Sequence, residues 1–383
     1  MVELASVIRP GDGVLWGQAC AEPQTLVEAA VAQRASFSGA SAFLGVSYSG
    51  IVRPEHADHL RFASYCGTGA NRALADAGVL DIYPAPYSQL GPLIRDRNIR
   101  AEVVLVQVSP PNARGEYSLA LGVEYLAPAL QAARAIVAEV NDQVPWTHTE
   151  PLLRRKDFAL MVKSSRAPVF LSYRCGELEA AIARNAAQFI PERAVLECGI
   201  GNVPNAVLGA LGERRGLRFH SGVIPDGVVE LHRNGVLSGE IHGGALMGTQ
   251  PLFDWARENP LVRLHSSEYT HGAEVLGRLE RFVAINSAVE VDFTGQVNGE
   301  LARGSYVGAV GGALDFVRAA NRSPGGVALI CLPSNRIVEK LSGPVATPRS
   351  EAGVIVTEKG AADLRGCTLR ERERRLRAIA EKP

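Results

Sequence analysis

The stretch that decides the fold runs from Arg281 to Ala320 and reads RFVAINSAVEVDFTGQVNGELARGSYVGAVGGALDFVRAA. Its first part alternates between apolar and polar residues, the period of an extended strand. The apolar face would carry Val283, Ile285, Val289, Val291 and Phe293, and the polar face Asn286, Glu290 and Asp292. We therefore expect a strand that buries one face and offers an amide and two carboxylates to a site on the other.

A glycine cluster, Gly308–Gly312, then opens into a helical pattern over Ala313–Ala320. Glycines before a helix let backbone N–H groups approach a ligand, and the start of a helix favours negative charge. The cluster is neither GxGxxG nor a P-loop, and many such turns only solve a steric problem. Spacing alone leaves both interpretations open.

The composition describes a globular chain without bias toward nucleic acid or membrane. The chain has 383 residues, of which 46% are hydrophobic, so two domains with sizeable cores are expected. Charged residues make up 21% and cancel to a formal net charge of zero, which gives no electrostatic footprint for nucleic acid. No apolar run reaches the ~18 residues of a membrane span, and the N-terminus lacks the features of a signal peptide.

The cysteines and histidines indicate no metal site. The six cysteines lie far apart without a CxxC pair, as in a chain with the reduced thiols of the cytoplasm. No HxxxH or HExxH motif occurs, and His56 and His59 lie in a polar stretch typical of a surface. We therefore expect a cytoplasmic protein with no metal and no permanently bound cofactor.

Short helices, glycine turns and apolar strands alternate along the chain. Ala101–Ser109 and Gly326–Pro333 are nearly continuous apolar runs that end at proline, as expected for central parallel strands. Tyr125–Val140 has helical composition, and Arg370–Lys382 indicates a charged, solvated surface helix. Further helices are expected at 25–33, 71–77, 177–189 and 206–211, and further strands at 42–50, 194–204 and 353–357. This alternation predicts an α/β fold with mostly parallel sheets.

Several short motifs follow one another through most of the chain. They are Gln107–Pro111 with Gly115, Gly199–Pro204, Val283–Ser287, Glu290–Asp292, Gly295–Val297, Val310–Gly312 with Asp315–Arg318, Val356–Gly360 and Asp363–Gly366. In this order they resemble the acetyl-CoA hydrolase/transferase family of the class I CoA-transferase superfamily. That family includes 4-hydroxybutyrate, butyrate and acetate CoA-transferases.

The resemblance implies two related open α/β domains of the CoA-transferase type, with the active site between them, in a homodimer. With the irregular charged passage Thr147–Arg166 between the halves, we predict domains at 1–175 and 176–383, the second carrying the CoA-binding motifs. The implied partners are an acyl-CoA and a small carboxylate, with coenzyme A as the substrate moiety. Neither nucleic acid nor a membrane is expected as a partner.

The nucleophile of the family is missing from its motif. In family members a glutamate attacks the thioester and forms an anhydride, then a glutamyl-CoA thioester. The family pattern places this glutamate between a small hydroxyl residue and a hydrophobe, shortly before Asp-Gly-Val-Val. Here the motif reads HSGVIPDGVV from His220 to Val229, so Gly222 stands at the nucleophile position. We expect the gap left by glycine to hold a water or part of a substrate. A triad of His220, Ser221 and Asp226 is not supported, since triad partners meet in space and not by adjacency.

The same resemblance nominates the other site residues. Asn286 and Glu358 match positions that line the acyl and CoA site, and Glu290, expected on the strand face of Asn286, is the candidate base. The CoA-binding candidates are Gly199, Ile200, Gly201, Asn202, Val203, Gly308, Gly311 and Gly312. The structural alternatives are that Asn286 satisfies a buried backbone group, that Glu358 caps a helix or pairs with Lys359, and that the glycines only make turns. Ser47 and Ser49 match weakly, and the spare carboxylates are Glu268, Glu290 and Glu300. Lys359 itself replaces a tyrosine common in the family.

Three functions remain open at this stage. The first is an acyl-CoA enzyme that hydrolyses the thioester, or performs another reaction without a glutamyl anhydride. The second is a catalytically silent CoA-binding or partner subunit. The third is a CoA-transferase that uses another carboxylate. The first is preferred because the motifs for thioester binding are present while the nucleophile is absent.

Overall fold

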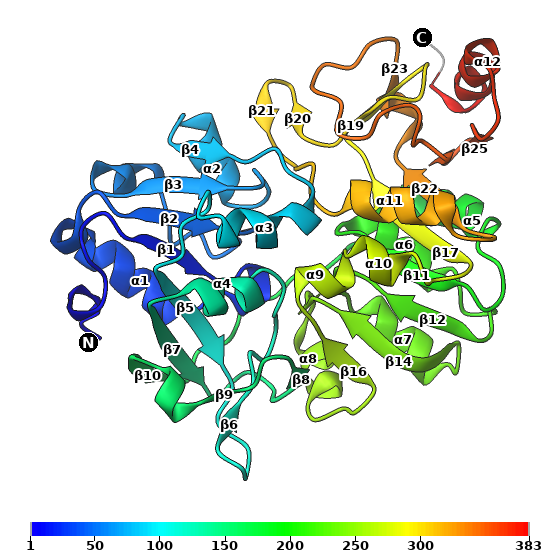
Figure 1. Cartoon of the computed structure of the whole chain (residues 1–383). Helices are drawn as coiled ribbons and strands as arrows, with labels where there is room; N and C mark the ends of the chain where they lie inside the picture. The colour runs from blue at the N-terminus through cyan, green and yellow to red at the C-terminus, as the bar shows by residue number, and fades with distance from the viewer. Residues whose placement is uncertain (1, 382–383) are drawn as a thin grey trace. The chain divides into compact units, whose positions relative to one another are not determined.

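The computed structural model describes residues 2–381 and divides into two compact units (Figure 1). The first unit comprises residues 1–171, 244–268 and 305–307, and the second comprises 172–243, 269–304 and 308–383. Both units are discontinuous along the chain, so the division into 1–175 and 176–383 stays a prediction. Both are open α/β layers with mostly parallel sheets, which confirms the predicted fold class.

The first unit is built on a sheet whose strands all pair in parallel. Their order is β10 (Leu160–Ser164), β7 (Ala135–Asn141), β5 (Val103–Val108), β1 (Gly13–Trp16), β2 (Ser41–Leu44), β3 (Arg61–Ser64) and β4 (Leu80–Ile82). The helices of this unit include α1 (Gln24–Gln33), α2 (Asn71–Asp76), α3 (Leu90–Arg95), α4 (Leu126–Ala132) and α8 (Gln250–Ala256). Short strands of this unit also pair with each other: β6 (Glu116–Tyr117) with β9 (Leu153–Arg154), and β8 (His148–Thr149) with β16 (Val262–Leu264).

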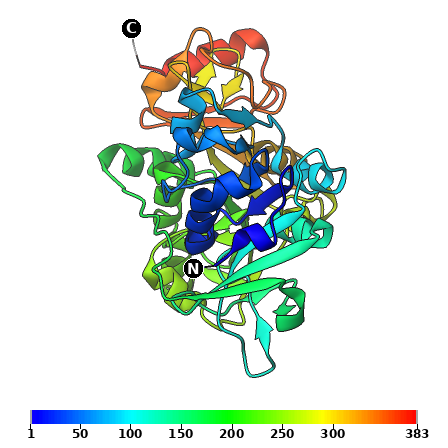
Figure 2. The ribbon, with the colours of Figure 1, turned by 90° about the vertical axis from the view of Figure 1, so that its left-hand side faces the viewer.

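The core of the first unit lies between α1 and the sheet. Leu26 and Val27 of α1 are buried against Val14, Trp16 and other apolar side chains of the strands. Figure 2 views the unit from the side that carries α1. β5 is buried at every position, as its continuous apolar sequence predicted for a central parallel strand.

One predicted helix of this unit is wrong in its second half. Tyr125–Val140 divides into the short helix α4 and the strand β7, which begins at Ala135. β7 pairs in parallel with β5 on one side and β10 on the other. Alanine is the strongest helix former, but helix propensity is a weak preference that pairing inside a buried sheet outweighs.

The second unit contains a sheet in the order β25 (Gly360–Asp363), β24 (Val354–Thr357), β22 (Val327–Cys331), β17 (Phe282–Ser287), β11 (Val195–Cys198), β12 (Leu217–His220) and β14 (Leu237–Gly243). All neighbours pair in parallel except β24 with β25. Its helices are α5 (Glu177–Ala187), α6 (Asn202–Gly209), α7 (Gly227–Arg233), α10 (Ala273–Leu276), α11 (Ala313–Arg322) and α12 (Leu369–Ile379). The short strands β13 (Val223–Ile224) and β20 (Leu301–Ala302) also belong to the second unit. The short strands β15 (Ala245–Leu246) and β21 (Ser305–Tyr306) belong to the first unit. The helix α9 (Ser267–Thr270) contains the point at which the chain leaves the first unit and enters the second.

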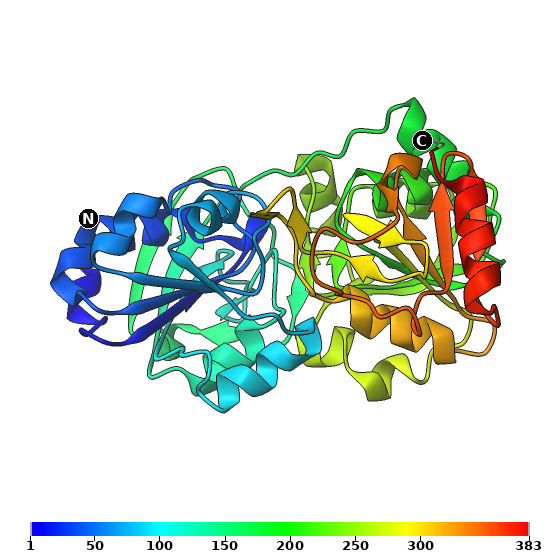
Figure 3. The same ribbon diagram turned by 90° about the horizontal axis from the view of Figure 1, so that it is seen from above.

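Helices cover both faces of the second sheet. Figure 3 shows α11 and α5 on opposite sides of it. On the α11 side, Phe316 and Val317 pack against Phe282 and Ala284 of β17. Because strand side chains alternate, Asn286 points to this same covered side. The predicted solvent-compatible polar face of β17 is therefore wrong: its residues are buried on both faces up to Asn286.

The predicted alternation of apolar and polar residues also runs across the end of one strand and the start of another. β17 ends at Ser287, and Glu290–Asp292 forms a separate strand, β18. β18 belongs to a small sheet with β19 (Val297–Asn298) and β23 (Ile337–Val338). Residues 288 and 289 interrupt the strand, so period-two counting across them assigned Glu290 to a face that it does not share with Asn286.

The C-terminal helix α12 is more than a solvated surface element. Leu376 and Ile379 are buried in a cluster with Ile355 of β24 and with Ala362 and Leu364 near β25. Figures 1 and 3 show α12 beside β25. Lys382, the end of the predicted helix, lies outside the described residues.

We expect Leu376→Ala to destabilise the second unit by about 2–5 kcal/mol, because it removes a fully buried side chain from this cluster. The matched control is Leu369→Ala, the same substitution in the same helix at a side chain that is 55% exposed, where the change should stay within ~0.5 kcal/mol. Urea unfolding of the two variants measures the difference. Equal losses would show that α12 does not contribute to the core as described.

Candidate functional site

The predicted site residues of the second unit gather at one edge of its sheet. β12, β11, β17, β22 and β24 are parallel, so their carboxyl ends meet at the same edge. Gly222, Gly199 and Glu358 lie in the loops after β12, β11 and β24, and Asn286 lies near the end of β17 itself. In open α/β sheets this is the edge where ligands bind.

The loop Gly199–Val203 joins β11 to α6. Gly201 has φ +137° and precedes the first helical residue, Asn202. A side chain is strained in that conformation, so the glycine is required by the backbone. At Gly199 a β-carbon would lie 2.9 Å from Oδ1 of Asn286. The backbone of the loop thus lies so close to the Asn286 side chain that no side chain fits at Gly199. The neighbouring residue Ile200 is 38% exposed.

In the second cluster, Gly308–Gly312, glycine is needed for different reasons at different positions. Gly308 lies against the chain, because a β-carbon there would be 2.0 Å from the carbonyl oxygen of Gly299. Its N–H also donates to the carbonyl of Glu300, so Gly308 fits the steric interpretation. Gly311 has φ +55° and lies directly before Gly312, the residue that precedes α11.

Asn286 is held by a buried acid that the sequence reading missed. Its Nδ2 donates to Oε2 of Glu197 at 2.8 Å, and the N–H of Ile285 donates to the same oxygen at 3.0 Å. Glu197 lies on β11, and burial raises its pKa to about 8 despite these two hydrogen bonds. The carboxyl group is therefore mostly protonated at neutral pH. The signal was one acid in an otherwise apolar strand, Val-Leu-Glu-Cys.

Glu290 and Glu358 are ionised, and a serine donates to each through its N–H and its hydroxyl, while Asn298 also donates to Glu290 at 3.3 Å. Glu290 accepts hydrogen bonds from the N–H and the hydroxyl of Ser342, each at 2.8 Å. Glu358 accepts from the N–H of Ser334 at 2.9 Å and from its hydroxyl. Burial opposes ionisation at both sites, but these hydrogen bonds outweigh it and hold both pKa values below the usual range. Glu358 thus caps the turn that starts at Ser334, which was one structural alternative for it.

Gly222 does not leave an open gap. A β-carbon at Gly222 would lie 3.0 Å from Cε1 and 3.1 Å from Nε2 of His271. A β-carbon at Gly312 would lie 2.4 Å from the same Nε2. The imidazole of His271 therefore lies between the two glycines. We expected a space for water or substrate at Gly222, but the ring of His271 lies against the position that a β-carbon would take there, so this expectation is wrong at that position. Nothing in the sequence pattern linked His271 to Gly222.

Two neighbours of Gly222 fix this arrangement. Burial lowers the pKa of His220 to about 4, so its ring is neutral and its Nε2 donates to the carbonyl of Thr270 at 2.9 Å. Ser221 donates to the carbonyl of Cys198 and accepts from the N–H of Cys198. Both side chains are committed to the backbone, which agrees with the rejection of a triad.

The remaining spare carboxylates have other surroundings. Glu268 belongs to the first unit and forms an ion pair with Arg95 there. Glu300 is buried in the second unit, where its backbone N–H donates to Oδ1 of Asn298. Lys359 donates to the carbonyl of Ala380 at 3.4 Å, and so contacts the end of α12.

The first unit holds two buried acids at the carboxyl ends of its strands. Ser47 and Ser49, the weak family matches, both donate to Glu22 at 3.0–3.4 Å. Burial raises the pKa of Glu22 to about 7 despite these bonds. Burial likewise raises the pKa of Glu124 to about 7, although Gln18 and Tyr87 donate to it. The sequence analysis did not identify either acid, because a buried acid produces no periodic pattern of apolar and polar residues.

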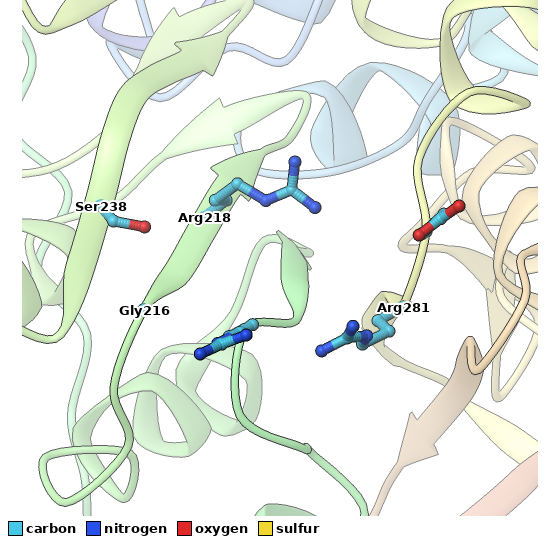
Figure 4. A pocket seen from close by; sticks show the side chains of 6 residues that line it. Gly216, Arg218, Ser238 and Arg281 are labelled. Carbon is cyan, nitrogen blue, oxygen red and sulfur yellow. The ribbon is translucent and has the colours of Figure 1, made fainter.

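A surface hollow of about 330 Å³ lies at the opposite edge of the second sheet (Figure 4). It is lined at the amino ends of the strands by Arg193, Gly216, Arg218, Ser238, Glu280 and Arg281. Figure 4 shows the Arg218 and Arg281 side chains extending from two of these strand starts. None of the predicted site residues lines this hollow, so it is separate from the glycine loops.

Two family models match the chain. The acetyl-CoA hydrolase/transferase N-terminal domain matches residues 1–151, and the C-terminal domain matches residues 248–382. The chain belongs to the acetyl-CoA hydrolase/transferase family. This confirms the family that the motifs indicated. The C-terminal model spans the loop Gly308–Gly312, whereas the loop Gly199–Val203 lies between the two matched ranges.

The relatives within this family differ in activity. A 4-hydroxybutyrate coenzyme A transferase of Clostridium kluyveri is 33% identical over 387 residues, which cover 96% of this chain and 90% of the relative. An acetyl-CoA hydrolase of Kluyveromyces lactis is 29% identical over 198 residues, 47% of this chain and 37% of the relative. The crystal structure of RipA from Yersinia pestis aligns with a TM-score of 0.94 at 27% identity, covering 99% of this chain and 92% of RipA. Family membership thus supports an acyl-CoA enzyme and leaves the reaction open.

We predict that Gly201→Ala weakens CoA binding at least tenfold, because a side chain at φ +137° strains the backbone by about 1–3 kcal/mol and shifts the loop. The matched control is Gly209→Ala at the other end of α6, where a β-carbon meets no atom within 4 Å. Titration calorimetry with CoA compares both variants with the native protein. Unchanged affinity in folded Gly201→Ala would remove the loop from the CoA site.

The buried acid Glu197 gives a pH dependence of defined sign. Its pKa is about 8 in the folded chain against an ordinary value of 4.5, so the folded state holds the proton more tightly. The resulting stabilisation is complete below the ordinary value and is lost as the pH rises through about 8. Glu197→Gln cannot ionise, so its free energy of unfolding relative to the native chain should rise steadily from about pH 5 to about pH 9.

Urea unfolding of both proteins across this range measures the effect. The other buried acids are the same in both chains and cancel in the comparison. A difference that does not change with pH would show that Glu197 ionises normally in the folded protein.

Proposed function

We propose that the protein hydrolyses an acyl-CoA thioester and does not transfer CoA through a glutamyl anhydride. The observation that carries this proposal is the pair Gly222 and His271. We propose that Gly222 occupies the position of the family's glutamate. This chain has no side chain there, and an imidazole ring lies 3.0 Å from the point where one would start. A site without a carboxylate nucleophile has water as its simplest acceptor.

The surroundings support thioester chemistry. We propose that the loops at Gly199–Val203 and Gly308–Gly312 bind the CoA moiety and a developing oxyanion through backbone N–H groups. The N–H groups of Gly199, Gly308 and Ala309 are excluded from this role, because they donate to carbonyl groups of the chain. Asn286 is held in place beside Gly199 by Glu197. We propose that its amide orients the acyl group.

The candidate carboxylates are poorly suited to replace the nucleophile. Glu290 and Glu358 each accept two hydrogen bonds from one serine, and Glu268 is paired with Arg95. A carboxylate whose lone pairs are engaged and whose pKa is low is a weaker nucleophile. This argues against a CoA-transferase that uses another carboxylate. CoA transfer is the activity that the name of the Clostridium kluyveri relative gives.

The test is a panel of acyl-CoAs incubated with the purified protein, with free thiol followed in the absence and presence of acetate. We expect thiol release without an acceptor, at a rate that acetate does not raise. Hydroxylamine or borohydride trapping should find no glutamyl-CoA adduct. Acyl transfer to acetate, or an adduct at any glutamate, would instead identify a transferase. Saturable CoA binding without turnover would identify a silent subunit.

Restoring the nucleophile should need two substitutions. Gly222 is not among the residues with positive φ, so the backbone permits a side chain, but Gly222→Glu would press on His271 at 3.0 Å. We expect no trappable adduct, or a trace, in Gly222→Glu alone. The double variant Gly222→Glu with His271→Ala removes the obstructing ring and should form the adduct and transfer CoA slowly. His271→Ala alone serves as the control without a carboxylate. Equal adduct in single and double variants would contradict the steric argument.

A further inference from the structure

The hollow at the amino ends of the strands of the second sheet is lined by three arginines, Arg193, Arg218 and Arg281, and by one acid, Glu280. We propose that this hollow is a second ligand site, which binds a small molecule that carries two or more linked phosphate groups. The site lies at the opposite edge of the sheet from the glycine loops, so it does not depend on the proposed hydrolysis.

The guanidinium groups of these three arginines are not used inside the protein. Neither an ion pair nor a side-chain hydrogen bond joins Arg193, Arg218 or Arg281 to another residue that the structure describes. Arg318 of the same unit, by contrast, pairs with Glu351. Like charges gathered around one hollow repel one another, and a bound anion would remove that repulsion.

Two of the arginines start from hydrogen-bonded backbone of the sheet. Arg218 lies on β12 and Arg281 directly precedes β17, on the two sides of β11. The N–H of Arg218 donates to the carbonyl of Ala194 at 2.8 Å, and the N–H of Val195 donates to the carbonyl of Arg281 at 3.1 Å. Figure 4 shows both side chains extending from their strands toward the space between them. The sheet therefore positions two forks of donors around one hollow, and a site on regular elements is more precise than one on loops.

Two of the arginines also occupy a backbone conformation that disfavours them. Arg193 has φ +59° and Arg281 has φ +53°, in the left-handed region that side chains other than Asn and Asp rarely adopt. Strain of this kind clusters at binding sites. A β-carbon at Gly216 would lie 3.3 Å from Cγ of Arg193, so glycine leaves room for the stem of that arginine. Arginine in place of glycine at 193 and 281 costs stability and adds positive charge to the hollow.

The lining indicates the class of the ligand. Guanidinium groups match phosphate oxygens with pairs of N–H donors, and a terminal phosphate offers three oxygens where a carboxylate offers two. Ser238 uses its hydroxyl proton for the carbonyl of Leu217 at 3.3 Å, so the arginines supply the side-chain donors. Their positive charge exceeds the negative charge of Glu280 by two, which linked phosphates neutralise. The volume of about 330 Å³ falls within the range of small-molecule sites, about 300–1,000 Å³.

The experiment is a calorimetric titration of the protein with sodium pyrophosphate at constant ionic strength. We expect saturable binding that Arg218→Gln and Arg281→Gln each weaken about fivefold or more, because each variant loses charge-assisted hydrogen bonds. Glu280→Gln removes a repelling charge and should tighten binding about two- to fivefold. The matched control is Arg233→Gln, at an exposed arginine of α7 in the same unit that does not line the hollow. It should leave the affinity within about twofold of the native value.

Arg193→Gly separates a role in binding from a role in the fold. Glycine adopts φ +59° without strain, so the melting temperature should not fall, whereas pyrophosphate should bind about fivefold more weakly or worse. A structural arginine would give the opposite result, with a lower melting temperature and an unchanged affinity.

A second titration with ADP distinguishes two sources of the phosphate groups. ADP binding that Arg218→Gln and Arg281→Gln weaken would assign a nucleotide, and pyrophosphate binding alone would assign an inorganic diphosphate. Unchanged affinities in both folded variants, tighter binding lost in Glu280→Gln, or a native protein that binds neither probe saturably would overturn the site. These outcomes leave the proposed hydrolysis standing, because that reaction is measured separately by thiol release.

Discussion

Parallel pairing of β12, β11, β17, β22 and β24 is the constraint on which the candidate site depends. It brings to one edge residues that lie as far apart in the chain as Gly199 and Glu358. Antiparallel order would place alternate loops at opposite edges and disperse these groups. The pairing also explains how Glu197 and Asn286 meet, because both side chains point to the α11 side from adjacent strands.

Acids of two kinds result from this arrangement. Glu22, Glu124 and Glu197 are enclosed without a paired cation among the described residues and become weak acids, because burial penalises their charge. Glu290 and Glu358 lie nearer to solvent and stay charged, each with the N–H and hydroxyl of one serine as partners. The protein thus separates buried groups that hold a proton from carboxylates that keep a fixed negative charge.

The sequence predicted the parts that depend on local composition. The apolar runs that became β5 and β22, the helix α11 and the glycine turns follow from residue type and spacing. β7 was missed because alanine is compatible with helix and strand, and only pairing with β5 and β10 decides between them. The division between β17 and β18 was missed because counting cannot detect a change of sheet. The contact of His271 with Gly222 joins two distant segments, so no local pattern could predict it.

The ring between Gly222 and Gly312 also constrains how the chain can evolve. A mutation that gives Gly222 a side chain collides with His271, and one that removes His271 alone leaves neither imidazole nor carboxylate. Each first step toward a glutamate at position 222 in place of the ring is therefore unfavourable by itself, although the two together are compatible. Such epistasis makes the exchange of one side chain for the other hard to reverse by single mutations. Lineages that carry the histidine should keep both glycines together with it.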